Sequence, residues 1–88
     1  MQTREFLMQA RLDARLCEAW IEAGWLRPGG EAGSREFSDV DLARARLISD
    51  LRNDLGVNDE SVPVVLDLID QIHGLRRVVR HLLERSHP

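Results

Sequence analysis

The fold is decided by residues 22–42, which read EAGWLRPGGEAGSREFSDVDL. Gly24 falls where a preceding helix would end with a left-handed residue. The glycine-rich segment 29–34 predicts a loop between two short extended pieces, which is the shape of a small β wing; a plain flexible loop is the alternative. Ser38 is a residue type that begins helices, and with Asp41 three positions later it predicts a variant of the capping box.

Two short helices are expected before this stretch. Thr3 is suited to cap a helix over residues 5–9, and Asp13 is suited to cap a second helix that runs to about Ala23. Apolar side chains recur at helical spacing in the second helix, at Leu16, Cys17, Trp20 and Ile21. Two such helices joined by a tight turn predict a helix-turn-helix.

A third and a fourth helix are expected after it. The third begins at Ser38 and ends at Gly56, with a core stripe formed by Leu47, Ile48, Leu51 and Leu55. The fourth begins near residues 59–61, tolerates Pro63 in its first turn and runs to about Arg85.

The fourth helix carries an apolar seam. Its members follow spacings of three and four residues, as in a short coiled coil: Val65, Leu68, Ile72, Leu75, Val79 and Leu82. The rest of the chain is too small to cover this helix fully, so we predict that the seam pairs with a second copy in a homodimer. A single helix folded against its own domain is the alternative, and Gly74 weakens the helix locally.

Length and composition predict one soluble domain over residues 1–88. We divide it into a helix-turn-helix head with the third helix, residues 3–57, and a long C-terminal helix, residues 59–85. No apolar run approaches the roughly 20 residues that span a bilayer. The first ten residues lack the apolar segment of a signal peptide, and the single cysteine cannot form an internal disulfide. These features predict a cytoplasmic protein.

Charge is unevenly distributed along the chain. Residues 1–35 carry five arginines and five acids, residues 36–70 carry nine acids against three arginines, and residues 71–88 carry four arginines and one glutamate. A nucleic-acid binder is expected to carry a basic patch on its reading head. The acidic middle suits a basic protein partner better.

Little in the sequence indicates catalysis. Cys17 lies on the apolar face of the second helix, which is typical of a buried small hydrophobe. The three histidines have no metal-ligand spacing, and the glycine cluster lacks the spacing of a phosphate-binding loop. We therefore predict that the chain is no enzyme and has no cofactor and no metal site.

The order of these elements resembles the MerR-like winged-helix head. Residues 22–28, EAGWLRP, are similar to that family's stretch between recognition helix and wing, and residues 35–42, REFSDVDL, to its stretch between wing and third helix. The resemblance implies a mainly all-α fold: a winged helix-turn-helix head with a small β wing, followed by two longer helices.

A closer resemblance is to the CbpM branch of chaperone modulators. It rests on Glu5-Phe6, on Gly24 and Pro28, on residues 51–58, LRNDLGVN, and on the apolar helix over residues 62–75. It covers about residues 3–83. The resemblance implies a protein that binds the J-domain of a DnaJ-type co-chaperone, CbpA, and suppresses its stimulation of the Hsp70 chaperone, because the J-domain recruits Hsp70 with a basic helix.

On this hypothesis the partner-binding residues are the acids of the middle segment. They are Asp39, Asp41, Asp50, Asp54, Asp59, Glu60, Asp67 and Asp70. The alternative is a MerR-like DNA-binding regulator of transcription. Its reading face, on the second helix, would consist of Ala14, Arg15, Glu18, Ala19 and Glu22, and glutamates facing phosphates would weaken DNA binding.

Overall fold

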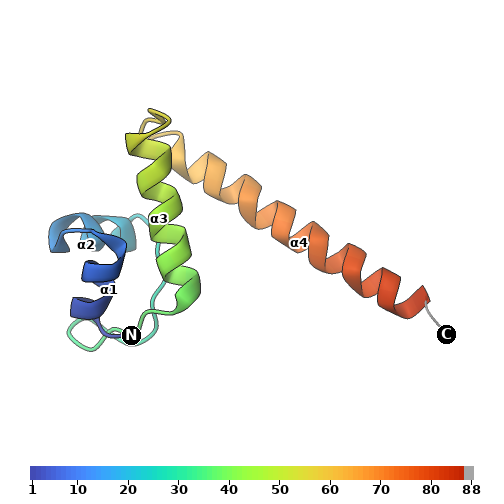
Figure 1. The fold of residues 1–88 in the computed structure, drawn as a ribbon, viewed down its shortest axis with the longest axis horizontal. Helices are drawn as coiled ribbons and strands as arrows, with labels where there is room; N and C mark the ends of the chain where they lie inside the picture. Colours follow the sequence, from blue (N-terminus) through green and yellow to red (C-terminus); the bar gives the residue numbers. More distant parts are fainter. Residues whose placement is uncertain (87–88) are drawn as a thin grey trace. The chain divides into compact units, whose positions relative to one another are not determined.

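The computed structural model describes residues 1–86, and within them the chain forms four helices and no extended strand (Figure 1). The helices are α1 (Thr3–Ala10), α2 (Ala14–Glu22), α3 (Asp39–Asn53) and α4 (Val62–Ser86). The chain divides into two compact units, residues 1–57 and residues 58–88. The predicted all-helical class, with a helix-turn-helix followed by two longer helices, is confirmed.

The helix-turn-helix is built by α1 and α2. Asp13 caps α2 as predicted, because its carboxylate accepts a hydrogen bond of 2.7 Å from the backbone N–H of Leu16. The prediction for α1 was wrong by one residue. Thr3 is the first residue of the helix and Gln2 is the N-cap, without a side-chain hydrogen bond. Arg11 turns the chain between the two helices in a left-handed conformation, with a φ of 54°.

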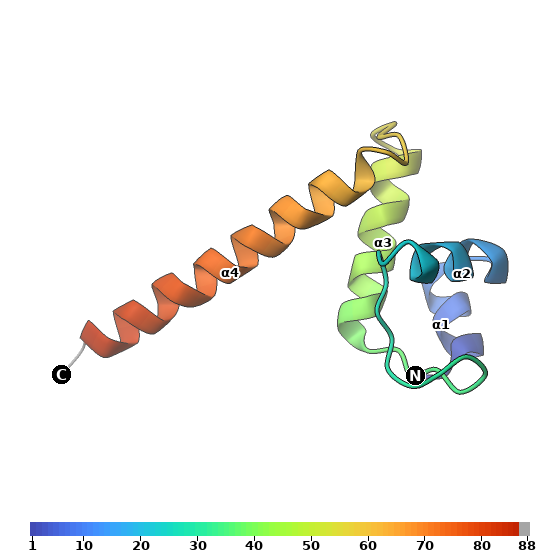
Figure 2. The ribbon, with the colours of Figure 1, turned by 180° about the vertical axis from the view of Figure 1, so that it is seen from behind.

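The wing is a loop closed by one antiparallel bridge between Gly29 and Glu36, in place of the small β wing that was expected. The backbone N–H of each residue donates a 2.9 Å hydrogen bond to the carbonyl of the other. Gly30 has a φ of 78°, and a Cβ atom at this position would lie 2.4 Å from the carbonyl oxygen of Ser34. The loop is therefore tight enough at this point to require glycine. In Figure 2 the segment runs from α2 past the N-terminus and into α3.

The core of the first unit forms where α1 packs against α3. The rings of Phe6, from α1, and Phe37, from the end of the wing, are both fully buried and stack with centroids 4.0 Å apart and planes 9° apart. The α3 stripe includes Leu42, Ala45, Ile48 and Leu51. These two aromatic rings tie the wing to α1 and α3, so the wing is held by the core.

One predicted member of the α3 stripe is wrong. Leu55 is 72% exposed, because α3 ends at Asn53 and Gly56 reverses the chain with a φ of 67°. The N–H of Val57 then bonds to the carbonyl of Leu51 at 2.8 Å. Gly56 ends the helical segment as predicted, but the reversal of the chain there leaves the side chain of Leu55 exposed.

The second unit is dominated by α4, which begins at Val62 and has Pro63 in its first turn as predicted. The N–H of Ser61 donates a 2.9 Å hydrogen bond to the side-chain oxygen of Asn58, in the turn before the helix. Val62 and Leu66 are the buried side chains of α4, whereas most of its other apolar side chains are exposed.

Candidate functional site

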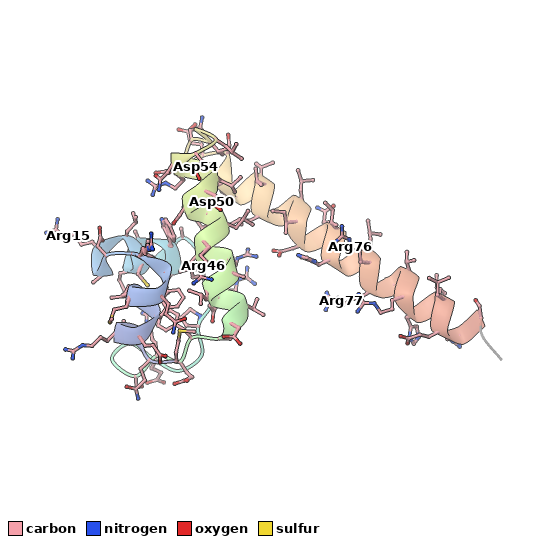
Figure 3. All side chains as sticks on the ribbon, in the orientation of Figure 1. Arg15, Arg46, Asp50, Asp54, Arg76 and Arg77 are labelled. Atoms are coloured by element: carbon pink, nitrogen blue, oxygen red, sulfur yellow. The ribbon has the colours of Figure 1, made fainter. Side chains whose placement is uncertain are left out.

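The exposed face of α3 carries three of the predicted acids. Asp39, Arg46 and Asp50 are separated by seven and four residues, which places them on one side of a helix. Asp54 follows as the C-cap residue, and Figure 3 shows Arg46, Asp50 and Asp54 in succession along α3. Three carboxylates and one guanidinium thus lie along about 22 Å of surface, at 1.5 Å per residue.

Asp41 does not belong to this surface. Its side chain is buried, at 7% exposure, and one carboxylate oxygen accepts hydrogen bonds from the backbone N–H of Ser38 at 2.9 Å and from its hydroxyl at 3.0 Å. The N–H of Asp41 donates in return to the Ser38 hydroxyl at 3.2 Å. This is the predicted capping box, and it occupies the carboxylate that the sequence placed among the partner-binding acids. We therefore remove Asp41 from the candidate surface.

A polar groove of about 450 Å³ borders the acidic face of α3. Its walls come from the end of α1 and the C-terminal half of α3, and its side chains include Gln9, Arg11, Arg46, Ser49, Asp50 and Asn53. A guanidinium nitrogen of Arg46 donates to the carbonyl oxygen of Gln9 at 3.3 Å. Sequence reasoning missed Arg46, although its spacing from Asp39 and Asp50 places it among the acids.

The remaining predicted acids belong to the second unit. Asp59 and Glu60 precede α4, whereas Asp67 and Asp70 lie on it three residues apart, and all four are exposed. Asp67 accepts a 2.9 Å hydrogen bond from the side-chain amide of Gln71. The candidate acids therefore form two sets: Asp39, Asp50 and Asp54 in the first unit, and the four acids of residues 59–70 in the second.

The exposed face of α2 would read DNA if the chain were a DNA-binding protein. All five of its predicted members are exposed, and Arg15 is labelled in Figure 3. Glu18, at the centre of this face, forms an ion pair of 2.8 Å with Arg35 of the wing. Sequence reasoning missed this pair, because the two residues are 17 positions apart and only the fold brings them together.

Residues 1–86 contain no group of three or more His, Cys, Asp or Glu side chains placed to hold a metal ion. Cys17 is buried, and that burial raises the pKa of its thiol; the carboxylate of Glu18 adds to the shift and the guanidinium of Arg35 opposes it. A thiol in this state is a poor nucleophile.

Most of the predicted seam of α4 is exposed. Val65 is half-buried, whereas Leu68, Ile72, Leu75, Val79 and Leu82 are exposed. Among residues 1–86 no helix is both long and apolar enough to cross a membrane.

A known protein family matches almost the whole chain. The family described as MerR HTH family regulatory protein matches residues 1–84. No curated protein and no solved structure gives a significant match.

Proposed function

Because the chain belongs to the MerR HTH family of regulatory proteins, we propose that it regulates a DnaJ-type co-chaperone by binding its J-domain. The acidic face of α3 covers the basic helix with which the J-domain recruits Hsp70, and binding there is competitive. The observation that carries this proposal is the exposure of Asp39, Asp50 and Asp54 along one face of a capped helix. The resemblance to the CbpM branch supplies the partner.

The rigidity of α3 makes its acidic face suitable for this role. The capping box fixes the start of the helix, and the buried side chains of Ile48 and Leu51 hold its opposite side in the core. A second contact holds α3 to the turn after α2, since the guanidinium Nε of Arg44 donates to the carbonyl oxygen of Trp25 at 2.6 Å. Carboxylates on a fixed backbone present a pattern of charge without losing much conformational freedom on binding.

Charge complementarity between the acidic face of α3 and a basic helix acts mainly on the rate at which the two proteins associate. Exposed charges at the rim of an interface change the association rate and its salt dependence more than the final affinity. Arg46 lies between Asp39 and Asp50, so a partner helix must present an acceptor or a gap opposite it. This single cation gives the surface a pattern that a uniformly basic peptide does not match.

The test is a titration of the purified protein with the cognate J-domain, followed by calorimetry and by Hsp70 ATPase stimulation. The variant Asp50→Lys/Asp54→Lys reverses the acidic face, whereas Asp67→Lys/Asp70→Lys makes the same change in charge in the second unit. A matched control, Glu22→Lys/Glu31→Lys, makes that change at exposed positions of α2 and the wing. We expect the α3 variant to lose about 10- to 100-fold in affinity, and the control variant to lose little.

Two results would contradict the proposal. One is wild-type protein that neither binds the J-domain nor lowers ATPase stimulation. The other is equal weakening by all three variants, which would show a general effect of net charge and no specific face.

DNA binding is the second candidate, and membership of a helix-turn-helix family favours it. The α2 face opposes it, because Glu18 and Glu22 are exposed there and Glu18 neutralises Arg35, the cation that the wing would offer to a phosphate. A gel shift on random duplex at increasing salt separates the two functions. Tight binding with a steep salt slope would favour DNA, whereas we expect weak binding throughout.

A further inference from the structure

A cleft of about 350 Å³ lies between α2 and the wing, within the first unit. The side chains of Ala14, Cys17 and Ile21 line this α2–wing cleft from the helix, and those of Ala32 and Phe37 line it from the wing. Cys17 and Phe37 are buried, whereas Ala14 and Ala32 are exposed, so the cleft has an apolar floor and an open mouth. Concave sites of this size with mostly apolar walls are typical of small-molecule binding.

Polar side chains line the same cleft, and they include Thr3, Glu18 and Arg35. The ion pair of 2.8 Å uses Nη2 of Arg35 and one carboxylate oxygen of Glu18. The other terminal nitrogen of Arg35, Nη1, is buried and has no hydrogen-bond partner within residues 1–86. Burying a donor without a partner costs free energy, and an acceptor that binds there would recover it.

The size and lining of the cleft favour a small apolar occupant over water. A water molecule takes about 30 Å³ in the liquid, so the cleft has room for on the order of ten waters. Most of these would lie against apolar walls and would find few hydrogen-bond partners. Replacing poorly ordered water with apolar groups favours binding. The cleft therefore suits a molecule of on the order of ten non-hydrogen atoms.

The charged pair specifies the polar group of that molecule. Nη1 of Arg35 offers a hydrogen-bond donor, and the half-exposed carboxylate of Glu18 offers an acceptor. An amide group carries the complementary pair, a carbonyl oxygen and an N–H. A carboxylate suits the site less well, because Glu18 already neutralises Arg35 and would repel a second anion at short range.

We infer that the α2–wing cleft binds a small apolar molecule that ends in an amide group. The carbonyl oxygen accepts a hydrogen bond from Nη1 of Arg35, and the amide N–H donates to Glu18. Because Nη1 is buried, the guanidinium turns slightly to reach the ligand. The apolar body lies against Cys17, Ile21 and Phe37. This inference is independent of the proposed J-domain function, because no acid of the α3 face lines the cleft.

The test is a titration of the labelled full chain with benzamide, followed by amide chemical shifts. We expect saturable shifts at Cys17, Ala32 and Arg35, with a Kd of about 1 mM, which is ordinary for a ligand of this size. The variant Ala14→Phe places a ring at the mouth of the cleft and is expected to weaken binding by about 10-fold or more. The matched control Ala19→Phe adds the same ring at an exposed position of α2 that does not line the cleft, and it should leave binding unchanged.

A second comparison tests the polar group. Benzoate is expected to bind the wild-type protein about 10-fold more weakly than benzamide, and Glu18→Gln, which removes the repelling charge, should reduce this difference. Both tryptophans lie in the first unit, so their fluorescence verifies that it remains folded in each variant. The absence of saturable shifts up to about 10 mM benzamide, or equal weakening by Ala14→Phe and Ala19→Phe, would overturn the site. Equal affinity of the wild-type protein for benzoate and benzamide would overturn the assignment of an amide.

Discussion

The carboxylate of Glu18, on the exposed face of α2, lies 2.8 Å from a guanidinium nitrogen of Arg35 in the wing. The other terminal nitrogen of this guanidinium, Nη1, is buried and has no hydrogen-bond partner in the structure. The two parts of a winged helix-turn-helix that would approach a nucleic acid are thus joined to each other, and the positive charge of the wing is compensated within the protein.

Breaking this pair should increase DNA binding without unfolding the protein. In Glu18→Gln the guanidinium of Arg35 keeps its position but loses its counter-charge. We expect a modest gain in affinity for random duplex and a steeper salt dependence in a filter-binding assay. The free energy of unfolding should fall by about 1–3 kcal/mol, because the side chain of Arg35 is only 16% exposed and its guanidinium is left with a neutral partner in place of the carboxylate. The comparison variant is Glu22→Gln, which removes the same charge from the same helix and leaves the pair intact. An equal gain in both variants would show that only net charge matters.

The capping box should make a measurable contribution to the stability of the first unit. Asp41→Ala removes the carboxylate that accepts from both the N–H and the hydroxyl of Ser38. We expect the free energy of unfolding to fall by about 1–2 kcal/mol in urea titrations followed by tryptophan fluorescence. Asp39→Ala, at an exposed position in the same turn, should lower it by less than about 0.5 kcal/mol. Equal losses in the two variants would contradict the distinction between them.

Cys17 should be protected from thiol reagents by the fold. Burial raises the pKa of its thiol above the ordinary value of 9.0. The folded protein therefore favours the protonated thiol. This preference contributes stability that is fully present below pH 9, the pKa of the thiol in the unfolded chain. The contribution is lost as the pH rises through the higher pKa of the thiol in the folded protein. Reaction with Ellman's reagent should be slow in native protein at pH 8 and fast in denaturant. Fast reaction in the native state would show that the thiol is accessible.

Gly74 should limit the stability of α4. It lies within the helix with a backbone that needs no glycine, and a Cβ atom placed on it meets no atom within 4 Å. Gly74→Ala should therefore stabilise the helix by up to about 1 kcal/mol, measured as an increase in helical circular dichroism and in thermal midpoint. A decrease would contradict the prediction that this position tolerates a side chain. Gly30→Ala is the opposite case and should be destabilising, because the added Cβ would meet the carbonyl oxygen of Ser34.

Local rules predicted the helices well because the signals that start and stop them lie within a few residues. Ser38 with Asp41, Asp13 with Leu16, and Gly24 with a φ of 80° act as the sequence suggests. The wing was less predictable. Glycines indicate a loop, but whether it closes with a ladder or a single bridge depends on its packing, here the stack of Phe37 on Phe6.

The candidate surface was predicted in part. The number of acidic residues in the middle segment predicted that the candidate surface is negatively charged. The role of each acidic residue, however, depends on the face of the helix on which it lies. Asp41 and Asp39 are two residues apart, and only the first is buried. An exposed aspartate is available to a partner. Asp41, which faces inward, caps the helix instead. Arg35 and Glu18 meet through the tertiary fold, which no local pattern encodes.

The most direct test of the central claim is chemical-shift mapping of labelled protein during titration with the cognate J-domain. Shifts should concentrate on the exposed face of α3, at the amides of Asp39, Arg46 and Asp50, and should diminish as salt is added. Unchanged α3 signals in the presence of the J-domain, together with shifts along α2 on addition of duplex DNA, would contradict it.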